Sequence, residues 1–188
     1  MIPKQIKADI VGKSNLASDY WLVVLKLKEK MDFVAGQYVS VLVDDSGIRR
    51  AYSVASLPDT DMIELLIDVA PMGLGSKFFL ESKVGQEIDI LGPLGRFVVS
   101  NPNEVGQMPI LFVATGSGIA PEKSMIESLL ANGYKGRLLL VWGMRCEENL
   151  FWQDRFETME KEHVNFGYRL VLSQPSDNWN GERGHVGE

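Results

Sequence analysis

The stretch Thr115-Gly116-Ser117-Gly118-Ile119-Ala120-Pro121 directly follows an unbroken apolar run, Pro109–Ala114. Its glycines predict a tight turn at the end of a buried strand, and its proline suits the first turn of a helix. Strand-like and helix-like runs then alternate, which predicts a parallel sheet with crossover helices. These runs are 120–131 (helix), 138–142 (strand), 150–162 (helix) and 168–172 (strand).

The first hundred residues follow a different pattern, in which short apolar or β-branched runs are separated by turn signals. Six such runs at this spacing predict an antiparallel barrel, with a short helix over 75–82. The stretch Asn101-Pro102-Asn103-Glu104 is typical of a linker, so we expect two domains, 1–101 and 102–188. The six runs are Ile6–Val11, Trp21–Leu27, Tyr38–Val43, Ala51–Ala55, Ile63–Val69 and Glu87–Leu91.

The composition of the chain excludes several classes of function. A net charge of −6 argues against a nucleic-acid partner, because binding to phosphate backbones needs a basic surface. The chain has no apolar run long enough to span a membrane and no apolar stretch typical of a signal peptide at its start. Cys146 is the single cysteine, which excludes an intrachain disulfide and favours a reducing cytoplasm. Neither His163 nor His185 has the spacing of a metal ligand, so no metal site is expected.

The strand residues Arg50-Ala51-Tyr52-Ser53 carry the first group of candidate binding side chains. Arg50 and Tyr52 lie two apart, so in a strand they can point the same way. A guanidinium makes forked hydrogen bonds to phosphate, a phenol ring can stack on another flat ring, and the Ser53 hydroxyl can bond a ring nitrogen. This combination suits a flavin with a phosphate tail. The alternative is an edge strand with a solvated arginine and a half-buried tyrosine.

Two glycine-containing turns precede expected helices. Before the first helix, Gly73 and Gly75 would let backbone N–H groups approach an anion, and Ser76 could add a hydroxyl; the alternative is an ordinary helix cap. In the second turn, 115–118, the helix would begin at the carboxyl end of a parallel strand, where ligands bind in such sheets. Here Pro121 stands where the dinucleotide fingerprint has its third glycine, and the alternative is a tight turn without a ligand.

Two further strand ends are expected on the same rim as Gly116. Gly143-Met144-Arg145 follows the second parallel strand, and Ser173-Gln174-Pro175 follows the third. Arg145 is a candidate for a contact with a ribose or a phosphate, and the alternative is a solvated loop arginine.

Taken together, these segments resemble the ferredoxin–NADP reductase family of flavin-dependent oxidoreductases. The resemblance implies a six-stranded antiparallel FAD-binding barrel followed by a parallel α/β nucleotide-binding domain. It covers nearly the whole chain, with the matching segments in the family's order. They are Arg50-Ala51-Tyr52-Ser53, Gly73-Leu74-Gly75-Ser76, Gly92-Pro93-Leu94-Gly95-Arg96-Phe97, Thr115 to Pro121, Trp142-Gly143-Met144-Arg145 and Trp179-Asn180-Gly181-Glu182-Arg183-Gly184-His185-Val186.

The resemblance also implies roles for individual residues. Arg50 would bind the flavin phosphate, Tyr52 would stack on the isoalloxazine ring and Ser53 would lie near its N5, which makes Tyr52 and Ser53 the implied catalytic residues. The remaining implied cofactor contacts are Ala51, the backbone of Ile67, Asp68 and Val69, the pyrophosphate-binding Gly73, Gly75 and Ser76, and the nucleotide-binding Thr115, Gly116, Ser117, Gly118 and Arg145.

The implied activity is hydride transfer from NADH or NADPH to FAD, rather than FMN, with electrons passing to a separate ferredoxin, flavodoxin or oxygenase component. Gln174 stands where NADPH-using members usually place an arginine, which favours NADH. Family members continue with further parallel strands, so we expect the NAD(P)-binding domain to be incomplete at its C-terminus and flavin binding to survive better than nicotinamide binding. The alternatives are a non-catalytic flavin electron-transfer subunit of a larger complex and a truncated flavin-binding fragment.

Overall fold

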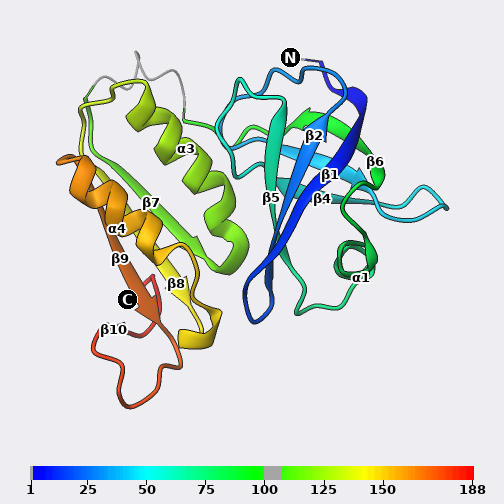
Figure 1. Ribbon diagram of the computed structural model, residues 1–188. Coiled ribbons are helices and arrows are strands. Elements are labelled where there is room, and N and C mark those ends of the chain that lie inside the picture. The colour runs from blue at the N-terminus through cyan, green and yellow to red at the C-terminus, as the bar shows by residue number, and fades with distance from the viewer. Residues whose placement is uncertain (1, 100–106) are drawn as a thin grey trace.

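A computed structural model of the chain describes residues 2–99 and 107–188. These residues form a six-stranded antiparallel sheet and a four-stranded parallel sheet with helices (Figure 1). The fold class expected from the sequence, an antiparallel barrel followed by a parallel α/β unit, is therefore confirmed. The linker expected over 101–104 lies outside the described residues, and the domain boundary there stays a prediction.

The first sheet has the strand order β4-β3-β6-β1-β2-β5. All six runs expected from the sequence are strands, and a bridge between Val54 and Leu65 brings the end of β4 onto β5, so that the sheet curls into a barrel. The helix expected over 75–82 is also present, as α1 at one end of the barrel (Figure 1). The elements are β1 (Lys4–Ala17), β2 (Tyr20–Leu27), β3 (Tyr38–Leu42), β4 (Arg49–Ser53), β5 (Met62–Asp68), α1 (Leu74–Glu81) and β6 (Glu87–Leu94).

The barrel interior is filled by alternate apolar residues of its strands. Val39 and Val41 of β3 and Leu65 and Ile67 of β5 are fully buried, as the period of two in a strand requires. Phe79 of α1 is buried in the same core cluster, which fixes the helix against the end of the barrel. Burial of one such ring stabilises the fold by about 1.5–3 kcal/mol.

The second sheet is parallel throughout, with the order β10-β9-β8-β7. The strands and helices expected here are all present. The short strand β10 escaped prediction because its two residues are charged and carry no apolar signal. The elements are β7 (Ile110–Thr115), a 3₁₀ turn η1 (Gly116–Gly118), α3 (Ile119–Ala131), β8 (Leu138–Met144), η2 (Glu147–Asn149), α4 (Gln153–Glu162), β9 (Phe166–Leu172) and β10 (Glu182–Arg183).

Strand β7 lies at one edge of the parallel sheet. Phe112 and Ala114 face the core, whereas Leu111 is 59% and Val113 46% exposed on the other face. Within the described residues β7 pairs with β8 alone. An apolar edge strand of this kind is a surface on which other chains can pair.

Helix α3 lies between the barrel and the parallel strands (Figure 1). Its apolar residues Ile119, Ala120 and Met125 belong to one buried cluster that also includes Tyr20 and Leu66 of the barrel. Because both sheets pack on this helix, its position determines how they are placed relative to each other. None of the helices in the described residues is long and apolar enough to cross a membrane.

Candidate functional site

Tertiary packing brings the strand residues Arg50 and Tyr52 together with Gly75 at the start of α1. On β4, Arg50 pairs with Val41 and Tyr52 with Val39 of β3. A β-carbon added at Gly75 would overlap the phenol oxygen of Tyr52 and would lie 3.2 Å from Cγ of Arg50. Only a glycine permits this close approach, so two segments that the sequence singled out separately form one site.

The ring of Tyr52 is held in a fixed orientation and stays protonated at neutral pH. It meets the ring of Phe79 edge-on, with centroids 5.0 Å apart and an interplanar angle of 90°. Burial raises the pKa of Tyr52 to about 12, against the opposing effect of the Arg50 charge. The phenol therefore offers a neutral hydroxyl and a flat face beside a guanidinium.

The N-terminus of α1 has no side-chain cap and no acidic residue in its first turn. The first intrahelical hydrogen bond is donated by Lys77 N–H to the Gly73 carbonyl, so the N–H groups of residues 74–76 precede it. The Ser76 hydroxyl donates to the Asp68 carbonyl at 3.2 Å and ties the helix to the end of β5. An uncapped helix start beside an arginine is suited to a phosphate.

The other barrel residues expected at this site lie on β4 and at the end of β5. Ser53 ends β4 and pairs with Tyr38, and Ala51 is exposed on the same strand. The side chains of Ile67 and Val69 are buried in the barrel core, so only their backbone groups are left to face a ligand. The roles expected for these residues stay predictions.

A hollow of about 350 Å³ lies at the carboxyl ends of β7, β8 and β9. The expectation that these three strand ends share one rim is confirmed. Of the nucleotide-binding residues expected here, Thr115, Gly116 and Arg145 line the hollow, and Ser117 and Gly118 lie beside it in the following turn. The lining residues are Thr115, Gly116, Gly143, Met144, Arg145, Ser173, Gln174, Gly184, His185 and Val186.

The turn after β7 is fixed from two sides. Gly116 has φ of +51°, a backbone conformation that favours glycine. Its carbonyl accepts a hydrogen bond from the indole Nε1 of the buried Trp142 at 3.1 Å. A β-carbon at residue 116 would come within 3.1 Å of the Tyr20 hydroxyl. The turn is therefore positioned both by the parallel sheet and by the barrel.

Two exposed side chains that line the hollow contact each other. Nε of Arg145 donates to Oε1 of Gln174 at 2.9 Å, and the backbone N–H of Gln174 donates to the Arg145 carbonyl at 2.7 Å. Arg145 retains its terminal N–H groups for a ligand, whereas Gln174 adds a neutral amide beside it.

No individual role was expected for residues 184–186, which line the hollow. Val186 comes so close that a β-carbon at Gly143 would lie 2.7 Å from it. The preceding loop is held by Arg183, whose guanidinium donates to the carbonyls of Ser176 and Trp179. The one feature of the sequence that points to this segment is the resemblance of residues 179–186 to a late segment of the family, and that resemblance implies no ligand contact for any single residue.

Glu122 lies in the first turn of α3, where an acidic side chain complements the helix dipole. Its side chain is only 4% exposed, and its Oε2 has no hydrogen-bond partner. Burial raises the pKa of Glu122 to about 7, although a hydrogen bond from the Val113 backbone opposes the shift. A carboxyl group that is partly protonated at neutral pH repels a nearby pyrophosphate less than a full charge would.

Across residues 2–99 and 107–188, no group of three or more His, Cys, Asp or Glu residues could hold a metal ion. The groups that the Arg50–Tyr52–Gly75 site and the hollow offer to a ligand are arginine, tyrosine, hydroxyl and backbone groups.

Two families of known domains match the chain in succession. The oxidoreductase FAD-binding domain matches residues 7–99, and the oxidoreductase NAD-binding domain matches residues 112–188. The first match contains the Arg50–Tyr52–Gly75 site, and the second contains the hollow at the parallel strand ends.

Individual relatives agree with these matches. Ferredoxin–NADP reductase B of Sorangium cellulosum is 33% identical over 82% of this chain and 63% of its own length. The reductase component of phenol 2-monooxygenase from a Pseudomonas species is 34% identical over 86% of this chain and 46% of its own length. The chain thus spans about half to three fifths of the length of these curated relatives.

Solved structures give the same result. The Amycolatopsis cytochrome P450 reductase superposes with a TM-score of 0.91 at 31% identity, over 97% of this chain and 56% of that one. Ferredoxin–NADP⁺ reductase of Plasmodium falciparum shares the fold, with a TM-score of 0.81 at 22% identity, over 90% of this chain and 70% of that one.

Proposed function

Because the chain belongs to the ferredoxin–NADP reductase family of flavoprotein oxidoreductases, we propose that it passes electrons from NADH or NADPH through FAD to a separate redox carrier. When bound, FAD would supply the redox chemistry: a hydride (one proton and two electrons) would reach it from NAD(P)H, which becomes NAD(P)⁺, and the two electrons would then pass to the carrier while the proton is released to water. The observation that carries the proposal is the meeting of Arg50, Tyr52 and Gly75 at an uncapped helix start.

The flavin site is built from the barrel and α1. Arg50 and the N–H groups of Gly75 and Ser76 bind the phosphates, and Gly73 contributes through its backbone alone, which has an ordinary φ of −74°. The ring of Tyr52 lies against the flavin, and Ser53 at the end of β4 lies near the reacting edge. Ala51 and the backbone of Ile67, Asp68 and Val69 border the cofactor. Support comes from the glycine contact, because a side chain at residue 75 would fill the cradle.

The nicotinamide nucleotide occupies the hollow at the ends of β7, β8 and β9. The backbone of 115–118 receives its phosphates at the start of α3, and Arg145 contacts its ribose or phosphate. NADH is preferred, because the neutral Gln174 amide already pairs with Arg145 and offers no second cation for a 2′-phosphate.

The acceptor is a separate protein, such as a ferredoxin, a flavodoxin or an oxygenase component. The support is that similar chains include a ferredoxin–NADP reductase, the reductase component of a phenol 2-monooxygenase and the reductase subunit of an aromatic O-demethylase. The two units divide near residues 101 and 102, and the single cysteine suits the reducing cytoplasm.

The test is a visible spectrum of the purified chain after incubation with FAD, recorded anaerobically before and after NADH. Retained yellow colour that bleaches with NADH is the expected result. Yellow colour that persists, and bleaches only with a reductase partner present, would replace the proposal with a non-catalytic electron-transfer subunit. Protein that stays colourless with excess FAD would contradict flavin binding altogether.

A further inference from the structure

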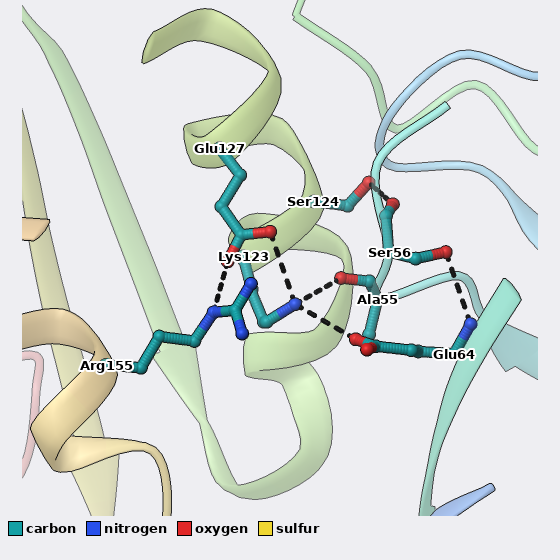
Figure 2. Close-up of polar contacts among 7 residues, drawn as sticks. All are labelled: Ala55, Ser56, Glu64, Lys123, Ser124, Glu127 and Arg155. Carbon is teal, nitrogen blue, oxygen red and sulfur yellow. Dashed lines mark hydrogen bonds and ion pairs between the residues drawn. The ribbon is translucent and has the colours of Figure 1, made fainter. Parts of the chain in front are cut away.

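Two consecutive residues in α3 hydrogen-bond to two consecutive carbonyls of the barrel. Nζ of Lys123 donates to the Ala55 carbonyl at 2.8 Å, and the Ser124 hydroxyl donates to the Ser56 carbonyl at 2.6 Å. Figure 2 shows both bonds crossing from the helix to the segment that follows β4. The helix is therefore attached to the barrel by specific polar contacts in addition to apolar packing.

The buried Lys123 ammonium is the centre of a network of charges whose outer members, Glu64 and Arg155, are partly exposed. Its side chain is 1% exposed, and its other two N–H groups reach Oε2 of Glu64 at 3.1 Å and Oε2 of Glu127 at 3.3 Å. Arg155 of α4 completes the network by pairing with Glu127 at 2.6 Å (Figure 2). Two cations thus balance two carboxylates, and all three donors of the ammonium are used.

This network draws on three separate parts of the fold. Ala55 and Glu64 belong to the barrel, Lys123 and Glu127 to α3, and Arg155 to α4. The ring of Trp152, at the start of α4, also lies 5.1 Å from the Lys123 nitrogen. A residue whose partners come from three elements fixes their relative positions, because moving any one element breaks a contact with an ammonium that is itself buried.

The network lies close in the chain to both proposed cofactor sites. Ala55 is two residues after Ser53, and Lys123 is five residues after Gly118. At the rise of an α-helix, five residues correspond to about 7.5 Å. The bonds of Lys123 therefore join the strand that ends at the flavin site to the helix that begins at the nucleotide site.

We propose that Lys123 is a positioning residue, which holds the nucleotide-binding unit against the flavin-binding barrel so that electron transfer between the two ligands is fast. The inference rests on the proposed function for the transfer step. Reactions between bound ligands are sensitive to placement, and an error of about 1 Å can cost roughly 100-fold in rate. Loss of Lys123 should therefore slow flavin reduction by about 10- to 100-fold at saturating NADH while leaving FAD affinity unchanged.

The test uses the single variant Lys123→Met and a double variant that combines Lys123→Met with Glu64→Gln. The second substitution removes the Glu64 carboxylate, which would otherwise be left without its cation. The exposed Lys135→Met is the matched control, because Lys135 lies outside the network. One readout needs neither cofactor. Spin labels are attached at Lys26→Cys on the barrel and at Lys161→Cys on α4, in a Cys146→Ser background. Pulsed electron paramagnetic resonance then reports the distance between the two labels. The other is the limiting rate of flavin reduction in stopped flow.

We expect a single narrow distance distribution in the parent and in Lys135→Met, and a broadened or shifted one in both Lys123 variants, together with slower flavin reduction. An unchanged distance distribution in the folded double variant would overturn the proposal. An unchanged limiting rate of flavin reduction would overturn it as well. A parent chain that binds FAD but is not reduced by NADH would contradict the proposed function and the kinetic role, and the distance measurement would still decide whether Lys123 holds the two units.

Discussion

Gly75 and Tyr52 are in such close contact that a β-carbon at residue 75 would overlap the phenol oxygen. Gly75→Ala should therefore displace either the start of α1 or the Tyr52 ring from the proposed phosphate cradle. Forced overpacking costs about 1–3 kcal/mol, which corresponds to a roughly 5- to 150-fold loss of FAD affinity. Titration of FAD with the apoprotein, followed by quenching of flavin fluorescence, measures this loss.

Gly73→Ala is the matched control for that substitution. Gly73 has φ of −74°, and nothing lies within 4 Å of its β-carbon position. Its replacement should leave FAD affinity within about threefold of the parent, since neither strain nor a clash is introduced. Equal losses in the two variants would show that the Tyr52 contact has no special role.

Arg50 should contribute more to FAD binding than its neighbour Arg49. Adjacent residues of a strand point to opposite faces, and the Arg49 guanidinium donates to the Ser40 carbonyl. A hydrogen bond to a charged group contributes about 1.5–3 kcal/mol, so Arg50→Met should weaken FAD binding by roughly 10-fold or more. Arg49→Met should change it much less. Equilibrium dialysis against FAD distinguishes the two, and the reverse order of effects would remove Arg50 from the phosphate site.

Gln174 should control the choice between NADH and NADPH. A guanidinium at this position would stand beside Arg145 and supply the second cation that a 2′-phosphate needs. Gln174→Arg should raise the ratio of kcat/KM for NADPH to that for NADH by about tenfold, or 1.4 kcal/mol. Gln174→Met, which adds no charge, should not raise the ratio. A parent chain that already prefers NADPH strongly would contradict the assignment.

Glu122 should make the free energy of unfolding depend on pH. Because the folded pKa is raised to about 7, the folded chain keeps a proton between pH 4.5 and 7 that the unfolded chain has released. This stabilisation is present at low pH and is lost as the pH rises through the folded pKa. At 1.36 kcal/mol per pKa unit, the loss is at most about 3 kcal/mol.

Urea unfolding of the parent and of Glu122→Gln at pH 5 and pH 8 measures this effect. The glutamine cannot ionise, so the variant should equal the parent within about 1 kcal/mol at pH 5 and exceed it at pH 8. The Val113 backbone donor still has an oxygen to bind in the variant. A difference in stability that does not change with pH would show that the Glu122 carboxyl titrates in its ordinary range.

The order of elements could be predicted from the sequence, because the first half consists mainly of short strand-like runs and the second half alternates strand-like with helix-like runs. The runs that became β3, β5, β7 and β8 are short and bounded by turn residues, and helix α3 begins next to a glycine pair and a proline. Strand β10 could not be predicted, because Glu182 and Arg183 look like loop residues until β9 lies beside them.

The site could be predicted in part. Arg50, Tyr52 and Gly75 were recognised as candidates within separate segments, but their mutual contact depends on how α1 packs on the barrel through Phe79. Lys123 could not be found in this way. A lysine in a helix is usually solvated, and its burial here depends on the Ala55 carbonyl and the Glu64 carboxylate, which are far away in the sequence.

The most direct test of the central claim is a crystal structure of the chain saturated with FAD. We predict electron density for an isoalloxazine ring against the face of Tyr52, with its phosphates bound by the Arg50 guanidinium and the first N–H groups of α1. FAD bound elsewhere, or an empty cradle with Arg50 and Tyr52 turned toward solvent at saturating FAD, would contradict it.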